Sequence, residues 1–397
     1  MANSILTPTA VTREALRILH QKLTFVSSIN RQYDDSFAKE GAKIGDTLKI
    51  RLPNQYTVTT GAALALQDTT ESSVSLQVAT QKHVGMQFTS AELTLSMDDF
   101  SKRIIEPAMA VLAASVEADA LQTMRKTVWQ QANNTASAIT FANVLGGRRK
   151  LNDSLAPPSD RTALLSSNDS AGLVDTLKGL FQDSGQLSKQ YKEGHMGYAA
   201  GFDFSESTHI PNQTRGDAAS YVVNTSTGIT SGTATITTTG GTGTINVGEV
   251  FTVAGVNAVH PETKVDTGVL QQFVVTTTAT GTGAWAVSPT PVTSGATQNI
   301  VINSAGASKA VVIAGTASTD YGQSMVYHKD AFTFATADLV MPKGVDWGAR
   351  EVYDGISLRI VRDYDINNDR LPCRVDILYG YKTLRGQLAC RLANLAG

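Results

Sequence analysis

One stretch of the chain carries almost no charge. The only charged side chains between residues 221 and 319 are Glu249, Glu262, Lys264, Asp266 and Lys309, whereas 17% of the whole chain is charged. Runs such as TATITTT and QQFVVTTT, separated by Gly, Asn and Pro, are typical of short strands in a small β-barrel or sandwich. Ordinary composition resumes with SMVYHKDAFTFATADL. We therefore expect residues 221–322 to form an all-β module inserted into a host domain.

An inserted module leaves and re-enters its host at neighbouring points, so we expect residues near Ser220 and Gln323 to be neighbours in space. Phe251, Phe273 and Trp285 have apolar surroundings in the sequence, and we expect them in the core of the module. A core of its own would let the module fold by itself. A folded module would in turn lower the entropic cost of bringing its two ends together in the host.

Residues 7–25 predict a helix, with Thr7 as a cap and Pro8 in the first turn. The expected apolar stripe consists of Val11, Ala15, Ile18 and Leu19. Arg13, Arg17 and Lys22 lie away from the stripe. The segment is either an ordinary amphipathic surface helix or a basic arm that docks on a partner, and the three cations are candidate interface residues.

Residues 44–90 change to a period of two. Leu48, Ile50 and Leu52 alternate with Lys49 and Arg51, and SSVSLQVAT alternates again after a weakly patterned stretch. Two such strands predict an extended β-hairpin, which needs a body or a neighbour to lie on. Lys49 and Arg51 are therefore candidates to pair with carboxylates of an adjacent subunit.

A long helix is predicted from Pro107 to Gln131, about 37 Å at 1.5 Å per residue. Ser96 with Asp99 indicates a capped start to a shorter helix before it. The apolar positions that recur at helical spacing are Ile105, Met109, Leu112, Val116, Ala120, Met124 and Val128. Residues 140–220 have a mixed α/β pattern, with a strand at RTALLSS and a helix at NDSAGLVDTLKGLF capped by Asn168 or Ser170.

The stretch DYDINND, residues 363–369, begins like a calcium-binding EF-hand loop. Such a loop needs Gly at its sixth position and Glu at its twelfth, where this chain has Asn368 and Arg374. The flanking segments alternate like strands. We therefore expect a polar connection between two antiparallel strands.

The sequence contains no Walker A, HExxH, GxSxG or CxxC motif, and its six histidines are widely spaced. We therefore expect no catalytic, cofactor-binding or metal-binding residues and no enzymatic activity. The net charge of −2 gives no strong attraction for nucleic acid, and two cysteines, Cys373 and Cys390, make no disulfide framework. The N-terminus does not read as a signal peptide, and no apolar run is long enough to span a membrane. We expect a soluble protein that is made and used in a cytoplasm.

Several phrases together resemble one family. They are MANSILTPTAVTREALRIL, QYDDSFAKEGAKIGDTLKIRLPNQYTV, TVAGVNAVHPETK with LQQFVVT, and EVYDGISLRIVRDYDINNDRLPCRVDILYGY. They resemble major capsid proteins of tailed bacteriophages, specifically the coat-protein family typified by short-tailed enterobacterial phages. The resemblance implies an α+β fold of the Hong Kong 97 type with an inserted all-β domain.

The resemblance also implies a division of the chain into segments. These would be an N-terminal arm at 1–30, an extended loop and its flanks at 31–97, and the peripheral-domain spine helix at 98–139. The axial domain would comprise 140–220 and 323–397, the latter returning to the peripheral domain, with the inserted module at 221–322. In relatives this module can carry a charged loop that contacts a neighbouring capsomer, which makes Glu262, Lys264 and Asp266 the matching candidates.

The implied function is self-assembly into hexamers and pentamers of an icosahedral head around double-stranded DNA. The implied partners are further copies of the chain, a scaffolding protein, a portal and, through weak contact, the packaged DNA, with no membrane and no cofactor. The protein would be located in the virion after assembly in the cytoplasm of the bacterial host. Two alternatives are a tail-associated or receptor-binding protein whose module binds carbohydrate, and an encapsulin-like cellular shell.

Overall fold

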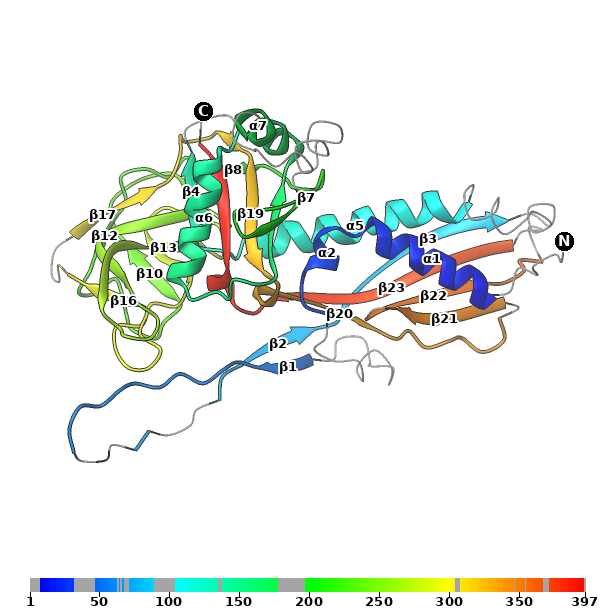
Figure 1. Cartoon of the computed structure of the whole chain (residues 1–397), viewed down its shortest axis with the longest axis horizontal. Helices are drawn as coiled ribbons and strands as arrows, with labels where there is room; N and C mark the ends of the chain where they lie inside the picture. Colours follow the sequence, from blue (N-terminus) through cyan, green and yellow to red (C-terminus); the bar gives the residue numbers. More distant parts are fainter. Residues whose placement is uncertain are drawn as a thin grey trace. The chain divides into compact units, whose positions relative to one another are not determined.

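The computed structural model describes residues 8–31, 47–62, 64, 66–67, 71–88, 104–134, 138–177, 197–303, 308–345, 347–353, 355–366 and 371–395. The chain forms two compact units (Figure 1). Unit 1 comprises Met1–Leu52, Ser73–Leu121 and Phe332–Leu384. Unit 2 comprises Pro53–Ser72, Gln122–Ala331 and Arg385–Gly397.

Unit 1 is built on a five-stranded antiparallel sheet in which β23 pairs with β20, β22 and β3, and β22 pairs with β21. The strands of this sheet are β3 (Thr80–Phe88), β20 (Phe332–Ala337), β21 (Trp347–Tyr353), β22 (Ile356–Arg362) and β23 (Leu371–Thr383). The helices are α1 (Pro8–Lys22), α2 (Phe25–Ser28) and α5 (Glu106–Arg125), whose last four residues belong to unit 2. Helix α1 packs on β21 and β22 (Figure 1).

Helix α1 confirms the predicted N-terminal helix, although it ends at Lys22 and a short second helix, α2, follows. The predicted stripe is buried: Val11, Ala15, Ile18 and Leu19 are all at most 4% exposed. The stripe therefore attaches the N-terminal segment to the sheet of unit 1.

Helix α5 confirms the predicted long helix but is shorter than expected. The predicted apolar positions, Ile105 to Val128, are each at most 2% exposed. The helix ends at Arg125 instead of Gln131. Thr127 Oγ1 donates to the carbonyl of Met124 at 2.7 Å, and such a local side-chain bond competes with helix continuation. Gln131 belongs to a strand instead. The expected start at Ser96 and Asp99 lies outside the described residues.

The predicted hairpin is present as β1 (Thr47–Arg51) and β2 (Ser73–Gln77), which pair antiparallel. Its ladder is shorter than the 44–90 span predicts, because β3 pairs with β23 and not with β1. Because Gly380 of β23 has no side chain, the backbone at Gln77 and Val78, between β2 and β3, can pass close to it. A Cβ atom at Gly380 would lie 2.2 Å from the carbonyl oxygen of Gln77.

Unit 2 contains a six-stranded sheet in the order β4-β24-β19-β5-β7-β6. Its strands are β4 (Gln131–Asn134), β5 (Arg161–Leu165), β6 (Tyr198–Ala199), β7 (Phe202–Glu206), β19 (Gln323–His328) and β24 (Ala389–Asn394). Two short 3-10 helices, η3 (Lys329–Ala331) and η4 (Gly386–Leu388), and the helices α6 (Phe141–Asp153) and α7 (Ser167–Leu177) complete this region. The predicted strand at RTALLSS is β5. Helix α7 is capped by Ser166, whose Oγ accepts from Asp169 N at 3.3 Å, and not by Asn168 or Ser170.

All the described secondary structure of residues 221–322 is β-strand, arranged around a seven-stranded sheet. The strands are β9 (Val222–Asn224), β10 (Thr235–Thr238), β11 (Thr244–Ile245), β12 (Val250–Val259), β13 (Asp266–Val275), β14 (Ala279–Thr280), β15 (Gly283–Ser288), β16 (Ile300–Ile302), β17 (Ser308–Ile313) and β18 (Asp320–Tyr321). Phe251, Phe273 and Trp285 are each at most 1% exposed and lie in one apolar cluster, as predicted.

The two chain crossings between module and host pair with each other. Strand β8 (Gln213–Thr214) is antiparallel to β18, and Arg215 N donates to the carbonyl of Thr319 at 3.0 Å. Ala218 and Ala219 then bond to Thr244 and Thr242 within the module. The chain therefore enters the module at 213–215 and leaves it at 319–321, a few residues before Ser220 and Gln323.

The C-terminal segment, residues 323–397, contributes strands to both units. Strands β19 and β24 lie in the six-stranded sheet of unit 2. Residues 332–384, by contrast, form most of the sheet of unit 1. The DYDINND stretch joins β22 to β23, which are antiparallel neighbours, as predicted.

Candidate assembly surfaces and the module junction

The basic residues of the N-terminal helix have partners within unit 1. Arg13 Nε lies 3.6 Å from Glu351 Oε2 on β21, Arg17 Nη2 lies 2.6 Å from Glu14 Oε1, and Lys22 Nζ lies 3.8 Å from Glu106 Oε1. The three cationic side chains are 71%, 54% and 48% exposed, respectively. Exposed ion pairs of this kind contribute little to stability, because water and salt screen them. The three residues are not brought together into one site.

A buried carboxylate, which sequence reasoning missed, attaches the same segment. Glu117 of α5 is 1% exposed and accepts hydrogen bonds from Thr24 N at 2.8 Å and Phe25 N at 2.9 Å. Phe25 also packs edge to face on Phe332, with ring centroids 5.6 Å apart. The available sequence signal was an acidic residue next to Val116, within the buried stripe of the helix.

The hairpin presents Lys49 and Arg51 on its exposed face, opposite Ile50, which is 4% exposed. Beyond the ladder, the tip is held by one side chain. Gln67 Oε1 accepts from Thr57 N at 2.9 Å, and Gln67 Nε2 donates to the Thr57 carbonyl at 2.5 Å. The large apolar side chains exposed at the tip are Tyr56 (57%), Val58 (98%), Leu64 (85%) and Leu66 (87%). All four side chains lie on the segment between β1 and β2.

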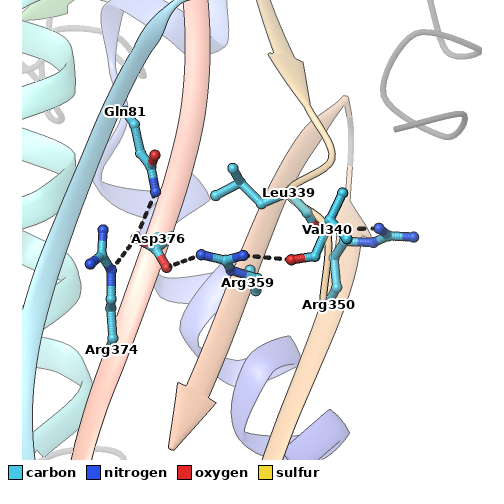
Figure 2. Close-up of polar contacts among 7 residues, drawn as sticks. All are labelled: Gln81, Leu339, Val340, Arg350, Arg359, Arg374 and Asp376. Carbon is cyan, nitrogen blue, oxygen red and sulfur yellow. Dashed lines mark hydrogen bonds and ion pairs between the residues drawn. The ribbon is translucent and has the colours of Figure 1, made fainter. Parts of the chain in front are cut away.

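A polar cluster fixes the connection between β20 and β21 in unit 1. Asp376 of β23 is fully buried and accepts from Arg359 Nη2 at 2.7 Å and from Arg374 Nε at 2.6 Å (Figure 2). Arg359 Nη1 also donates to the carbonyl of Val340 at 2.6 Å. Val340 itself is 74% exposed. The cluster therefore fixes the backbone of Val340, whose apolar side chain is exposed.

Burial alone would raise the pKa of Asp376. Hydrogen bonds from Arg359, Arg374 and Gln81, together with the charge of Arg359, outweigh it and lower the pKa of this carboxyl below its ordinary value. Gln81 Nε2 donates to Asp376 Oδ1 at 3.1 Å and lies beside Arg374 in Figure 2. Asp376 is therefore ionised at neutral pH.

In unit 2, the module contacts the edge strand of the host sheet through Gln272 of β13. Its Oε1 accepts from Gln131 N at 2.9 Å, and its Nε2 donates to the Gln131 carbonyl at 3.0 Å. Lys150 Nζ of α6 donates to the same Oε1 at 2.8 Å. One amide side chain thus pairs with both backbone groups of a residue in β4, as a neighbouring strand would.

A second contact lies at the turn between β11 and β12. Arg391 Nη1 of β24 donates to the carbonyl of Gly248 at 2.6 Å, and Gln213 Nε2 donates to the carbonyl of Val247 at 3.3 Å. Gly248 has φ +89°, and a Cβ there would lie 2.9 Å from the side chain of Lys126. The turn therefore requires glycine for both its conformation and its close approach to the host.

Three candidate residues lie in and after the connection between β12 and β13. Asp266 Oδ2 accepts from Asn303 Nδ2 at 2.6 Å and from Asn257 Nδ2 at 3.2 Å, and the Asn303 bond is the largest cause of a lowered Asp266 pKa. Lys264 Nζ donates to the Gln298 carbonyl at 3.3 Å. The side chain of Glu262 is exposed. The structure thus brings the three onto one hairpin, with two of them engaged inside the module.

No group of three or more His, Cys, Asp or Glu side chains able to hold a metal is found among the described residues. Both cysteines are free and buried. Burial raises the pKa of Cys373 to about 12 and that of Cys390 to about 11, so both are thiols and not nucleophilic thiolates at neutral pH. Within the described part of the chain, no helix is long and apolar enough to cross a membrane.

Comparison with solved structures finds phage capsids of low sequence identity. A Mycobacterium phage Che8 chain is 10% identical, with 93% of this chain and 90% of that chain covered and a TM-score of 0.47. The capsid of Ralstonia phage GP4 is 6% identical, with 95% and 92% covered and a TM-score of 0.49. The capsid of the cyanophage P-SCSP1u is 10% identical, with 90% and 85% covered and a TM-score of 0.46. No curated protein matches the chain.

Comparison with protein families gives a match that spans nearly the whole sequence. The family described as P22 coat protein, gene protein 5, matches residues 20–391. The match includes the hairpin, α5, the all-β module and both sheets. It confirms the resemblance seen in the sequence, together with the predicted α+β fold of Hong Kong 97 type. This protein therefore belongs to the P22 coat protein family and is a phage major capsid protein that associates with itself in the virion.

Proposed function

We propose that this capsid protein forms hexamers and pentamers that tile an icosahedral shell around double-stranded DNA, with no residue performing bond chemistry. The apolar hairpin tip carries the proposal, because Val58 and Leu66 are 98% and 87% exposed on a segment beyond the two-stranded ladder. Another copy of the chain is the partner that would cover them. Many such contacts, each weak, stabilise a closed shell together.

The other partners follow from the same function. A scaffolding protein and a portal direct assembly in the cytoplasm of the bacterial host. The net charge of −2 supports only weak contact with the packaged DNA. Arg13, Arg17, Lys22, Lys49 and Arg51, with Glu262, Lys264 and Asp266, remain the proposed charged interface residues.

The test replaces Val58 and Leu66 by Asp in the full chain and examines purified material by negative-stain electron microscopy. We expect soluble capsomers or subunits without shells, since charged tips cannot be buried in an apolar contact. The control is Val312→Asp, a valine 57% exposed on β17 of the module. Shells at normal yield from the tip variant would contradict the proposal.

A carbohydrate-binding tail protein is not favoured, because a glycan site needs exposed aromatic rings. Phe251, Phe273 and Trp285 are all in the module core. An encapsulin-like cellular shell is not favoured either, because the family match covers the inserted module.

A further inference from the structure

Two arginines are fully buried where the module meets its host in unit 2. Arg125 ends α5 and is 1% exposed, and Arg391 lies on β24 and is 0% exposed. The Nη1 atoms of both donate to the same oxygen, Gln323 Oε1, at 3.3 Å in the case of Arg391. Arg391 Nη1 also donates to the carbonyl of Gly248. The two guanidinium groups are therefore neighbours.

The remaining donors of the pair are not used within the described structure. Nε and Nη2 of Arg125 and of Arg391 have no hydrogen-bond partner there. No ion pair with either residue is found among the described side chains. The pair therefore presents four buried N–H-bearing nitrogens, and no carboxylate of the described residues forms an ion pair with it.

Two like charges enclosed without a counter-charge are unfavourable. Burial lowers the pKa of Arg125 to about 10, and burial followed by the charge of Arg125 lowers the pKa of Arg391 to about 9. Both values stay above neutral pH, so both groups remain cationic. A folded chain with this arrangement is stabilised by any negative charge that can reach the four nitrogens.

We propose that Arg125 and Arg391 bind a compact inorganic anion of the halide class, with chloride as the physiological occupant. Both side chains are buried, so a carboxylate on the surface of a partner cannot reach them. A halide accepts several N–H donors at once and makes no demand for a donor in return, which matches a site made of guanidinium nitrogens. It would neutralise the point where α5, β19, β24 and the Gly248 turn meet.

The site would make attachment of the module to the host dependent on chloride. Arg391 holds the Gly248 carbonyl of the module, and Gln323 is the first residue of β19 after the module. Occupation of the site would therefore favour the docked arrangement over an undocked one, independently of any contact between subunits.

Thermal unfolding of the full-length chain tests the site, followed by tryptophan fluorescence. Sodium gluconate, whose anion is a bulky organic carboxylate, is replaced stepwise by sodium chloride at constant ionic strength. We expect a saturable rise in the unfolding midpoint. A chloride concentration one hundred times its Kd would raise the folding equilibrium constant about a hundredfold. Chloride-35 line broadening that bromide competes away should report the same site directly.

Arg125→Gln should abolish both effects, whereas Arg149→Gln, which removes an exposed arginine from α6, should preserve them. If Arg125→Gln does not fold, the chloride-35 line broadening of the unsubstituted chain, and its loss on addition of bromide, tests the site instead. Identical midpoints in chloride and gluconate, or broadening that bromide does not displace, would overturn the proposal.

Discussion

Gln272 occupies the place of a strand at the free edge of a sheet. Its amide pairs with the backbone N and O of Gln131, which β4 would otherwise leave open at that edge. Leaving buried polar groups without partners costs about 1–3 kcal/mol per group. This single side chain therefore determines much of how the module docks.

We predict that Gln272→Ala loosens the docking without unfolding the module. The backbone amide of Gln131 should exchange its hydrogen faster, and the full chain should lose about 2–6 kcal/mol of stability, about 1–3 for each of the two backbone groups. Hydrogen exchange and thermal unfolding measure the two effects. Thr237→Ala, at an exposed position of β10, is the control. Unchanged exchange at Gln131 would show that the amide pairing contributes nothing.

Asp376 should make stability depend on acidity. The folded-state pKa of Asp376 is lowered, so its stabilisation is fully present above the ordinary value of 3.8 and is lost as the pH falls through the folded value. At pH 7, Asp376→Asn leaves Arg359 and Arg374 without their carboxylate and should cost about 3–5 kcal/mol. Urea unfolding should show the gap between variant and parent narrowing below pH 4. A gap independent of pH would contradict this account.

Burial could be predicted from the sequence for apolar residues of the core, but not for charged ones. Phe273 and Trp285 were assigned to the core because apolar runs surround them. Arg391, Asp376 and Glu117 are as buried, yet no local pattern distinguishes a buried charge from a surface one. Gln272 is separated from Gln131 by 141 residues, so its role depends on a contact that sequence periodicity does not encode.

At the scale of elements, charge reversal on the hairpin tests whether the hairpin is an interface between subunits. Lys49 and Arg51 lie on its exposed face. Replacing both with Glu should leave the fold intact, since such surface changes cost under about 0.5 kcal/mol, and should impair assembly. Electron microscopy gives the yield of shells, and circular dichroism gives the fold. Normal yield would show that the hairpin is not an electrostatic interface.

The types of the elements were predicted better than their ends and partners. Helix α5 has its predicted buried stripe. The helix ends at Arg125, but Val128, the last position of the stripe, is also buried after the helix end. Burial of an apolar residue therefore does not show that the helix continues to it. Strand β3 continues the alternation of the hairpin, but pairs with β23, a segment almost 300 residues later. Alternation identifies a strand and gives no information about its neighbour.

At the scale of the molecule, the module should fold without its host. Its core, which includes Phe251, Phe273 and Trp285, is built from residues of the module alone. We predict that residues 215–322, expressed by themselves, give a soluble β domain with no helical signal in circular dichroism. A random-coil spectrum would show that the host is required.

The host should in turn depend on the module. Phe273→Ala is expected to cost about 3–5 kcal/mol, because its side chain is 0% exposed. The full-length variant should then aggregate or assemble only at low temperature. Thr237→Ala again provides the control. If the Phe273→Ala variant assembles normally at elevated temperature, folding of the coat protein does not depend on the module.

The pairing of β8 with β18 suits the coat protein to the insertion of foreign domains. Thr214 and Asp320 are opposite each other across that antiparallel pair, so their Cα atoms are about 5 Å apart. Any small protein whose own two ends lie that close could replace the module, or be fused within it, without changing the path of the chain through the six-stranded sheet. Each copy in a shell would then carry one guest.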